Sequence, residues 1–263
     1  MVYAGCDIGA SVVKAVITKD REIRGLAKRK IDDRLEKVTK GVLKEALQAG
    51  GLSLRRVSTL GITGREARAV KFFRPFMPKL SFRPEELCIA KATHKMDLNI
   101  HTVIDIGALG FKIISIDERG MPIDIITNEK CASGGGRFLE NISKALEVDL
   151  DKMGEIALIS KEPCTITNQC VVFAETEVIS LVNKGIDKKH ILGGIVSSLA
   201  SQVASAAKRG GLKRDVAFIG GTSKNQGIYY YLEKNLDVKL KKIPMDPQFI
   251  SAYGAAILAG NSR

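Results

Sequence analysis

Two stretches of this chain of 263 residues repeat one pattern of carboxylate, glycine and lysine. The sequence Cys-Asp-Ile-Gly-Ala-Ser-Val-Val-Lys fills residues 6–14, and Ile-Asp-Ile-Gly-Ala-Leu-Gly-Phe-Lys fills residues 104–112. Asp, Ile, Gly, Ala and Lys recur at the same spacing, 98 positions apart. In each copy a short apolar run leads through a glycine turn into a second apolar run, which predicts a β-hairpin.

These residue types suit the magnesium-bound phosphates of a nucleotide. Glycine lets the turn bring its backbone amides close to an anion, and the Asp of the strand can hold Mg²⁺ through water. A single copy is more often an ordinary hairpin, whereas two copies, each opening half of the chain, favour nucleotide binding. We therefore expect Asp7 and Asp105 to be the catalytic carboxylates. The expected phosphate contacts are Gly9, Ala10, Ser11, Lys14 and Gly107.

A third segment fits the same ligand. The apolar run at residues 215–219 leads into Gly220 and Gly221, and a helix pattern follows Asn225. A strand, paired glycines and a helix N-terminus in this order admit a nucleotide against the backbone. We expect Gly220 and Gly221 to approach the adenosine, with Asn225 in the same cofactor site.

Two of the five cysteines stand before predicted helices. Cys131 opens a Cys-Ala-Ser-Gly-Gly-Gly loop, and Cys170 directly precedes or opens a helical run. Helix N-termini would stabilise thiolates and an anionic cluster there. Each cysteine alone is more often a small buried residue. Two per chain cannot fill a four-thiolate site, whereas two chains across a two-fold axis can.

The remaining composition limits the class of protein. The chain contains no run of eighteen apolar residues, and no basic leader precedes the first predicted strand, so we expect a cytoplasmic protein with no membrane partner. The formal charge is +12, but aromatic residues make up 5% and Trp is absent. Acids also interrupt the basic run at residues 19–34, so a solvated surface is favoured over a nucleic-acid site. A positive surface would instead suit nucleotide, coenzyme A or an acidic partner.

The two hairpins and the glycine pair together resemble the ATPase fold of actin, hexokinase and Hsp70. The resemblance implies an α/β protein of two lobes with duplicated mixed β-sheets, at residues 1–100 and 101–263. A last helix is expected at residues 247–259, where small residues at 251–256 suit close packing.

Residues 105–140 and 170–178 are similar to the BadF/BadG/BcrA/BcrD-type ATPases, which include 2-hydroxyacyl-CoA dehydratase activators and ATP-binding subunits of benzoyl-CoA reductase. The resemblance implies that Cys131 and Cys170 are the metal ligands of one [4Fe–4S] cluster at a dimer interface. Cys6, Cys88 and Cys164 match no ligand position and are read as structural. ATP and Mg²⁺ are the other implied cofactors. The glycines after Cys131 are expected to contact cofactor as well: Gly134, Gly135 and Gly136.

The motif sequences at residues 105–110 and 131–136 favour one subgroup of this family. Activators usually carry Asp-Ile-Gly-Gly-Gln-Asp at the second hairpin and Cys-Ala-Ala-Gly-Thr-Gly at the first cysteine. Residues 105–110 here read Asp-Ile-Gly-Ala-Leu-Gly, and residues 131–136 read Cys-Ala-Ser-Gly-Gly-Gly. These runs look like the D-type subunit of benzoyl-CoA reductase. The loss of the Gln-Asp pair predicts slow ATP hydrolysis, or ATP bound mainly for a structural effect.

The implied function is ATP-driven transfer of low-potential electrons to an acyl-CoA reductase. The implied partners are a homologous ATPase subunit or a second copy, catalytic acyl-CoA reductase or dehydratase subunits, and a ferredoxin-type donor. The alternatives are a homodimeric dehydratase activator, an activator of another iron–sulfur reductase, a small-molecule kinase of the same fold, and a non-catalytic assembly subunit.

Overall fold

The computed structural model describes residues 1–71, 78–128, 135–166, 171–213 and 215–261. The chain forms two compact units. Unit 1 comprises Met1–Asn99, Ile116–Ile123 and Ile243–Arg263, and unit 2 comprises Ile100–Ser115 and Asp124–Lys242. No helix in the described part of the chain is both long and apolar enough to cross a membrane.

Unit 1 is built on a five-stranded sheet with the strand order β3-β2-β1-β4-β5. β1 pairs antiparallel with β2 and parallel with β4, and β5 is parallel to β4. The strands are β1 (Val2–Ile8), β2 (Val12–Lys19), β3 (Glu22–Lys30), β4 (Val57–Thr63) and β5 (Lys79–Phe82). The helical segments are α1 (Leu35–Ala49), η1 (Leu54–Arg56), α2 (Glu85–Met96), η4 (Pro247–Phe249) and α8 (Ile250–Gly260).

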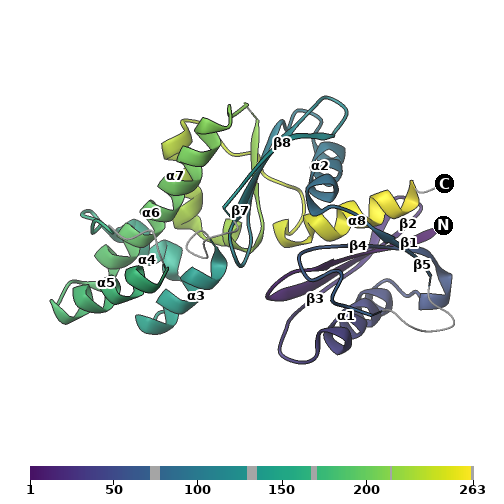
Figure 1. Cartoon of the computed structure of the whole chain (residues 1–263), viewed down its shortest axis with the longest axis horizontal. Helices are drawn as coiled ribbons and strands as arrows, with labels where there is room; N and C mark the ends of the chain where they lie inside the picture. The colour runs from purple at the N-terminus through teal and green to yellow at the C-terminus, as the bar shows by residue number, and fades with distance from the viewer. Residues whose placement is uncertain (72–77, 129–134, 167–170, 214, 262–263) are drawn as a thin grey trace. The chain divides into compact units, whose positions relative to one another are not determined.

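β1 reads as a nearly continuous apolar run because both of its faces are covered. α1 packs on β2 and β3 through Val38, Val42 and Ala46, which recur at helical spacing on one face. α8, drawn in yellow, lies across β1 and β4 beside α2 (Figure 1). The buried strands therefore hold the loops at their carboxyl ends on a rigid base.

The contact of α8 with the sheet is unusually close because glycines line it. A Cβ atom at Gly5 would lie 1.9 Å from the Ala252 carbonyl oxygen, and one at Gly61 would lie 2.1 Å from that of Ala255. On α8 itself, a Cβ at Gly254 would lie 1.9 Å from the Cys88 carbonyl oxygen. The close packing expected of the small residues at 251–256 is thus present. The expected division at residue 100 assigns this segment to the second lobe, whereas these contacts place it in unit 1.

Replacing Gly61 by Ala is expected to destabilise the protein by about 1–3 kcal/mol, because the α8 backbone would have to move. Gly41→Ala is the matched control. Gly41 lies within α1, and its Cβ would meet only the flexible end of Arg29, so this change should be neutral or stabilising. Urea unfolding midpoints measure both effects. Equal midpoints for wild type and Gly61→Ala would contradict the close packing.

Unit 2 is built on a four-stranded sheet with the order β8-β7-β6-β9. β6 pairs antiparallel with β7 and parallel with β9. The strands are β6 (Thr102–Ile106), β7 (Phe111–Ile116), β8 (Pro122–Thr127) and β9 (Val216–Ile219). The helical segments are α3 (Gly136–Ala145), α4 (Met153–Ile159), α5 (Val171–Asn183), α6 (Lys188–Arg209), η3 (Gly221–Lys224) and α7 (Gln226–Leu236).

The two sheets share one plan. In each sheet, the first strand of an antiparallel hairpin also pairs with a parallel strand on its other side. The strand orders are β2-β1-β4 in unit 1 and β7-β6-β9 in unit 2. Asp7 stands opposite Lys14, and Asp105 stands opposite Lys112. The duplicated α/β architecture predicted from the repeated motif is confirmed.

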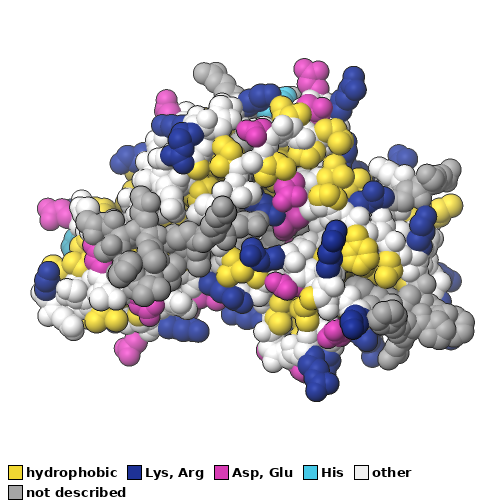
Figure 2. All heavy atoms as spheres, viewed as in Figure 1, with side chains coloured by type: hydrophobic (Ala, Val, Ile, Leu, Met, Phe, Trp, Pro, Cys, Tyr) yellow, Lys and Arg dark blue, Asp and Glu magenta, His cyan; other side chains and the backbone are white. Residues whose placement is uncertain are grey.

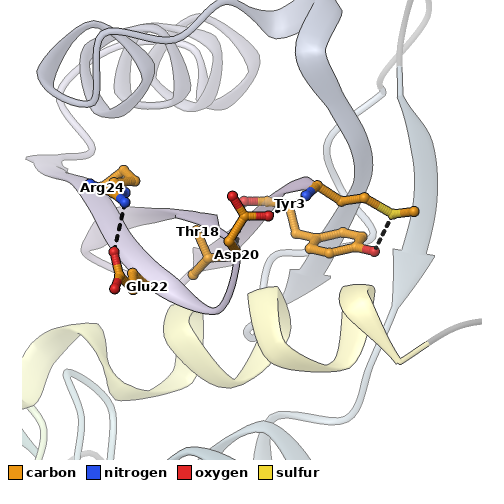
Figure 3. Close-up of polar contacts among 6 residues, drawn as sticks. Tyr3, Thr18, Asp20, Glu22 and Arg24 are labelled. Carbon is orange, nitrogen blue, oxygen red and sulfur yellow. Dashed lines mark hydrogen bonds and ion pairs between the residues drawn. The ribbon is translucent and has the colours of Figure 1, made fainter.

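Surface charges outside the hairpin turns form local pairs. The amino terminus bonds Asp20 at 2.6 Å, and Arg24 bonds Glu22 at 2.6 Å, both away from the hairpin turn of β1 and β2 (Figure 3). Figure 2 shows Lys and Arg side chains scattered among acidic and apolar ones on the face it presents. The excess of positive charge is therefore spread over that face and forms no single stripe there.

Candidate functional site

The first hairpin places a buried carboxylate beside a glycine turn. The turn closes with a hydrogen bond from the Gly9 amide to the Val12 carbonyl oxygen at 3.2 Å. Lys14 Nζ lies 2.8 Å from Asp7 Oδ2, and only 3% of the Asp7 side chain is exposed. Asp7 Oδ1 is buried and accepts no hydrogen bond from the part of the chain that the structure describes. Because a buried carboxylate oxygen without a donor is costly, this atom suits a cation or a water held by one.

The second hairpin repeats this geometry. The Gly107 amide donates to the Gly110 carbonyl oxygen at 2.9 Å, and Asp105 is buried in the strand before the turn. A Cβ at Gly107 would meet nothing nearer than the Gly110 oxygen at 3.8 Å, so the space beside this turn is open. At Gly9 the corresponding position lies 3.2 Å from Lys14 Nζ, so an ammonium group faces the first turn. Ala10 and Ser11 complete that turn and are half-buried.

Each carboxylate is contacted by a glycine in a left-handed conformation. Gly64 follows β4 with φ of +97°, and its Cβ would lie 2.3 Å from Asp7 Oδ1. Gly220 follows β9 with φ of +86°, and its Cβ would lie 2.5 Å from Asp105 Oδ1. Both glycines follow the residue that pairs with the Asp across the parallel ladder. Only glycine allows the backbone this conformation and this approach at no steric cost.

Gly64 lies at this site although it is outside the repeated motif. The signal was available, because Ile62-Thr63-Gly64 ends a buried strand as Phe218-Ile219-Gly220 does. This match covers only a few residues. It places a glycine at each carboxylate only because β4 pairs with β1 and β9 pairs with β6, and these pairings are seen in the fold and not in the local sequence.

The second turn also carries the N-terminus of α3. The Gly136 amide donates to the Gly107 carbonyl oxygen at 2.8 Å, and the Arg137 amide donates to that of Ala108 at 2.9 Å. A Cβ at Gly135 would lie 2.5 Å from both the Ala108 oxygen and the Gly110 nitrogen. Two of the glycines predicted to contact cofactor, Gly135 and Gly136, thus lie directly on the predicted phosphate turn.

The third segment forms η3 and the start of α7. Ser223 Oγ donates to the Gly220 carbonyl oxygen at 2.8 Å, which fixes the turn. Gly221 is the first residue of η3, and Gly136 would bring a Cβ to 3.4 Å from Thr222 Oγ1. Asn225 Oδ1 accepts a hydrogen bond from the Ile228 amide at 3.0 Å and thereby caps α7. A contact of Asn225 with nucleotide stays a prediction.

The predicted site residues therefore fall into two groups, one in each unit. Unit 1 brings together Asp7, Gly9, Ala10, Ser11 and Lys14. In unit 2, Asp105 and Gly107 of the second hairpin meet α3 and η3, which supply Gly135, Gly136, Gly220 and Gly221. Gly134, Cys131 and Cys170 lie outside the described residues.

The three other cysteines are free thiols with structural surroundings. Burial raises the pKa of Cys88 to about 12 and lifts the pKa of Cys6 well above its usual range. Burial also raises the pKa of Cys164, whose backbone amide donates to the His190 carbonyl oxygen at 2.9 Å. Neutral buried thiols are poor ligands. The described residues also contain no group of three or more His, Cys, Asp and Glu side chains that could hold a metal ion.

The two hairpins fit magnesium nucleotide by their chemistry. Each hairpin supplies one buried carboxylate, the first adds an ammonium group and a hydroxyl, and the space beside the Gly107 turn of the second is open. These are ligands that Mg²⁺ and phosphate take in proteins. The unsatisfied Asp7 oxygen supports the same ligand set.

Comparison with solved structures defines the class of fold. A hexokinase of the ROK type from Thermus thermophilus aligns with a TM-score of 0.55 at 12% identity and covers 99% of both chains. At this identity the likeness shows the fold alone, which is that of the two-lobed actin and hexokinase ATPases.

The family is narrower than the fold. A model described as the BadF/BadG/BcrA/BcrD ATPase family matches residues 4–259, and the chain belongs to that family. The 2-hydroxyisocaproyl-CoA dehydratase activator of Clostridioides difficile is 30% identical over 98% of this chain and 95% of its own length. A solved structure of the Clostridium difficile activator with bound ADPNP aligns with a TM-score of 0.89 over 99% of this chain and 95% of that one. The D-type subunit of benzoyl-CoA reductase from Thauera aromatica is 30% identical over 97% of this chain and 92% of its own length.

Proposed function

We propose that this chain is the ATP-hydrolysing, electron-delivering component of an acyl-CoA reductase, of the benzoyl-CoA reductase D type. In this proposal two such chains hold one [4Fe–4S] cluster through Cys131 and Cys170 of each. The observation that carries the proposal is the pair of hydrogen bonds from Gly136 and Arg137 of α3 to the second glycine turn. The predicted phosphate turn and the helix after the Cys131 segment are thereby one connected structure.

The nucleotide chemistry would use the residues of both hairpins. Asp7 and Asp105 would orient Mg²⁺ through its water ligands, and the Gly9 and Gly107 turns would direct backbone amides at the phosphates. Lys14 would balance the developing negative charge, because its ammonium group already faces the Gly9 turn. The backbone at Gly220 would approach the nucleoside, because glycine has no side chain and adopts the left-handed conformation found there.

The metal chemistry would rest on the two cysteines that stand before helices. An iron–sulfur cluster, when bound, accepts one electron and gives it on at low potential. Cys170 is followed directly by α5, and Cys131 lies in the segment that leads to α3. Helix N-termini favour negative charge, so these positions suit thiolates and an anionic cluster.

Coupling between the two chemistries follows from the contacts of α3. A nucleotide that moves the Gly107 turn would pull on the amides of Gly136 and Arg137, which are bonded to its carbonyl oxygens. The α3 N-terminus would then shift with the turn. The electron would pass from a ferredoxin-type donor through this chain to a separate catalytic subunit that binds the acyl-CoA.

The Ala-Leu-Gly run of the second turn favours the D-type assignment. This run has no polar side chains where dehydratase activators carry Gln and Asp. We therefore expect the isolated chain to hydrolyse ATP slowly. The second candidate is a homodimeric 2-hydroxyacyl-CoA dehydratase activator. The full-length similarity to the activator of C. difficile favours this second candidate. Its sequence identity, 30%, equals that of the reductase subunit from T. aromatica.

Native mass measurement after co-expression with neighbouring genes distinguishes these two candidates. The D-type assignment predicts a complex of this chain with a second ATPase subunit and catalytic subunits, and low ATPase activity of this chain alone. The activator assignment predicts a homodimer of about 57 kDa, twice the chain mass of 28.5 kDa, with rapid ATP hydrolysis. A homodimer that hydrolyses ATP quickly and activates a dehydratase would refute the D-type assignment and leave the family intact.

A further inference from the structure

A row of charged side chains crosses three strands of unit 1 at the level of Asp7. Asp7 of β1 stands opposite Lys14 of β2, and Lys14 stands opposite Lys28 of β3. Residues directly opposite one another in antiparallel strands project from the same face of the sheet. Gly5, two residues before Asp7, meets the α8 backbone on this face. The row therefore lies on the side of the sheet on which α8 packs.

The far end of the row is fixed by the segment that leads into α8. Lys28 Nζ lies 2.9 Å from Asp246 Oδ2 and also bonds Gln248 Oε1. The same ammonium group stands 5.6 Å from the centroid of the Phe249 ring, which is buried. Asp246 Oδ1 accepts a hydrogen bond from the Gln248 amide at 3.0 Å and thereby caps η4. Three contacts with one short segment thus define the position of the Lys28 charge.

Two lysines face each other in this row, and each has a carboxylate beside it. Lys14 pairs with Asp7 at 2.8 Å, and Lys28 pairs with Asp246 at 2.9 Å. Like charges directly opposite in a sheet repel, and the two carboxylates offset that repulsion. The Cβ atoms of such a cross-strand pair are about 5 Å apart. Because η4 also packs on β2, the strand of Lys14, the Asp246 carboxylate lies within reach of the Lys14 side chain.

We propose, resting on the function proposed above, that Lys28 is a positioning residue that keeps the Lys14 ammonium group on Asp7 and the Gly9 turn. Lys28 balances the charge of Asp246, and its own charge repels Lys14 towards Asp7. Without Lys28, Asp246 competes with Asp7 for the Lys14 ammonium group. Lys14 then spends less time at the turn where the nucleotide phosphates would bind. Lys28 acts through Lys14 and has no assigned contact with nucleotide.

Two substitutions break the same ion pair and leave opposite charges behind, so each is the control for the other. Lys28→Met keeps an apolar side chain beside Phe249 and leaves Asp246 charged. Complete loss of a preorganised electrostatic contact costs about 10²- to 10³-fold in kcat. Here Lys14 is displaced for only part of the time, so we expect kcat for Mg-ATP hydrolysis to fall about 10-fold, with KM within about 2-fold of wild type.

Asp246→Asn leaves Lys28 charged and keeps a side-chain oxygen for the cap of η4. Because the competing carboxylate is removed, we expect kcat within about 2-fold of wild type. The double variant of Lys28→Met with Asp246→Asn has lost both charges, and its kcat should return to within about 3-fold of wild type. A purely structural role of the contact between β3 and η4 predicts the reverse, with the double variant at least as impaired as Lys28→Met. Lys28→Arg keeps the charge and should keep kcat.

Steady-state ATPase kinetics of the full chain and calorimetric affinities for Mg-ADPNP measure these effects. Urea unfolding midpoints show whether the variants fold. The side chains of Lys28 and Asp246 are 36% and 28% exposed, so their ion pair contributes little to stability, and the midpoints should stay close to that of wild type.

The outcomes separate this inference from the function on which it rests. An unchanged kcat in Lys28→Met, or equal losses in both single variants and the double variant, would overturn the inference and leave the proposed function intact. A large rise in KM at unchanged kcat would also overturn it, because Lys28 would then contribute to nucleotide binding and not to the placement of Lys14. A wild type that neither binds Mg-ADPNP nor hydrolyses Mg-ATP contradicts the proposed function, and the inference falls with it.

Discussion

Replacing Cys131 or Cys170 by Ser is expected to abolish the iron–sulfur cluster, with iron and acid-labile sulfide falling to background. A cluster shared by two chains loses one of its four thiolates with each substitution in a complex with a second ATPase subunit and two in a homodimer, and serine does not replace them at neutral pH. Iron and sulfide assays of anaerobically prepared protein, together with absorbance near 400 nm, measure the loss.

Cys164→Ser is the matched control for both changes. Cys164 precedes Cys170 by six residues in the sequence, is half-buried, and has a pKa raised by burial. Its main-chain bond to His190 does not depend on the thiol, so the cluster should stay at wild-type level in this variant. Full iron content in both Cys131→Ser and Cys170→Ser would refute the metal assignment.

Asp7→Asn and Asp105→Asn are expected to lower the kcat/KM for Mg-ATP hydrolysis by about 100-fold or more. Removing a preorganised electrostatic contact to developing charge typically costs 10²- to 10³-fold. The amide keeps the shape of the side chain but loses the charge that would orient Mg²⁺. Asp7 also pairs with Lys14 at 2.8 Å, so part of the effect at this position would come through the lysine.

Asp20→Asn provides the control at the far end of β1 and β2. Asp20 is exposed and pairs with the amino terminus, and an exposed pair of this kind contributes little to stability. Its hydrolysis rate should equal that of wild type. ATPase rates and calorimetric affinities should be measured over a range of magnesium concentrations. Unchanged affinity and turnover in both Asp7→Asn and Asp105→Asn would remove the nucleotide-site assignment.

The local parts of this site could be predicted from sequence. The repeat of Asp, Gly and Lys gives the strand pairing as well as the turn, because side chains alternate along a strand and the turn fixes the register. Asp7 therefore stands opposite Lys14 as the spacing indicates. Gly220, the first of the paired glycines, is left-handed after a buried strand, and a glycine directly after an apolar run is a local signal of this kind.

The parts that could not be predicted depend on contacts between distant segments. Gly64 belongs beside Asp7 because β4 pairs with β1, and no local pattern in the sequence states that pairing. The seating of Gly135 and Gly136 on the Gly107 turn likewise depends on tertiary contacts between separate segments. Glycines are ambiguous in a sequence, since flexibility, a positive φ and a close approach all favour the same residue.

Unit 1 is built from three separate stretches of the chain, so it cannot fold completely until the third stretch, which begins at Ile243, has been synthesised. The strands β1 and β4 leave the ribosome well before the helix that covers them, which begins at Ile250. Until α8 emerges, Gly5 and Gly61 face no α8 backbone, and this face of the sheet stays uncovered. The contiguous stretch from Asp124 to Lys242, most of unit 2, is complete earlier in synthesis. The nascent chain therefore carries an exposed apolar sheet face from the synthesis of β4 until that of α8, which is the kind of surface that chaperones bind.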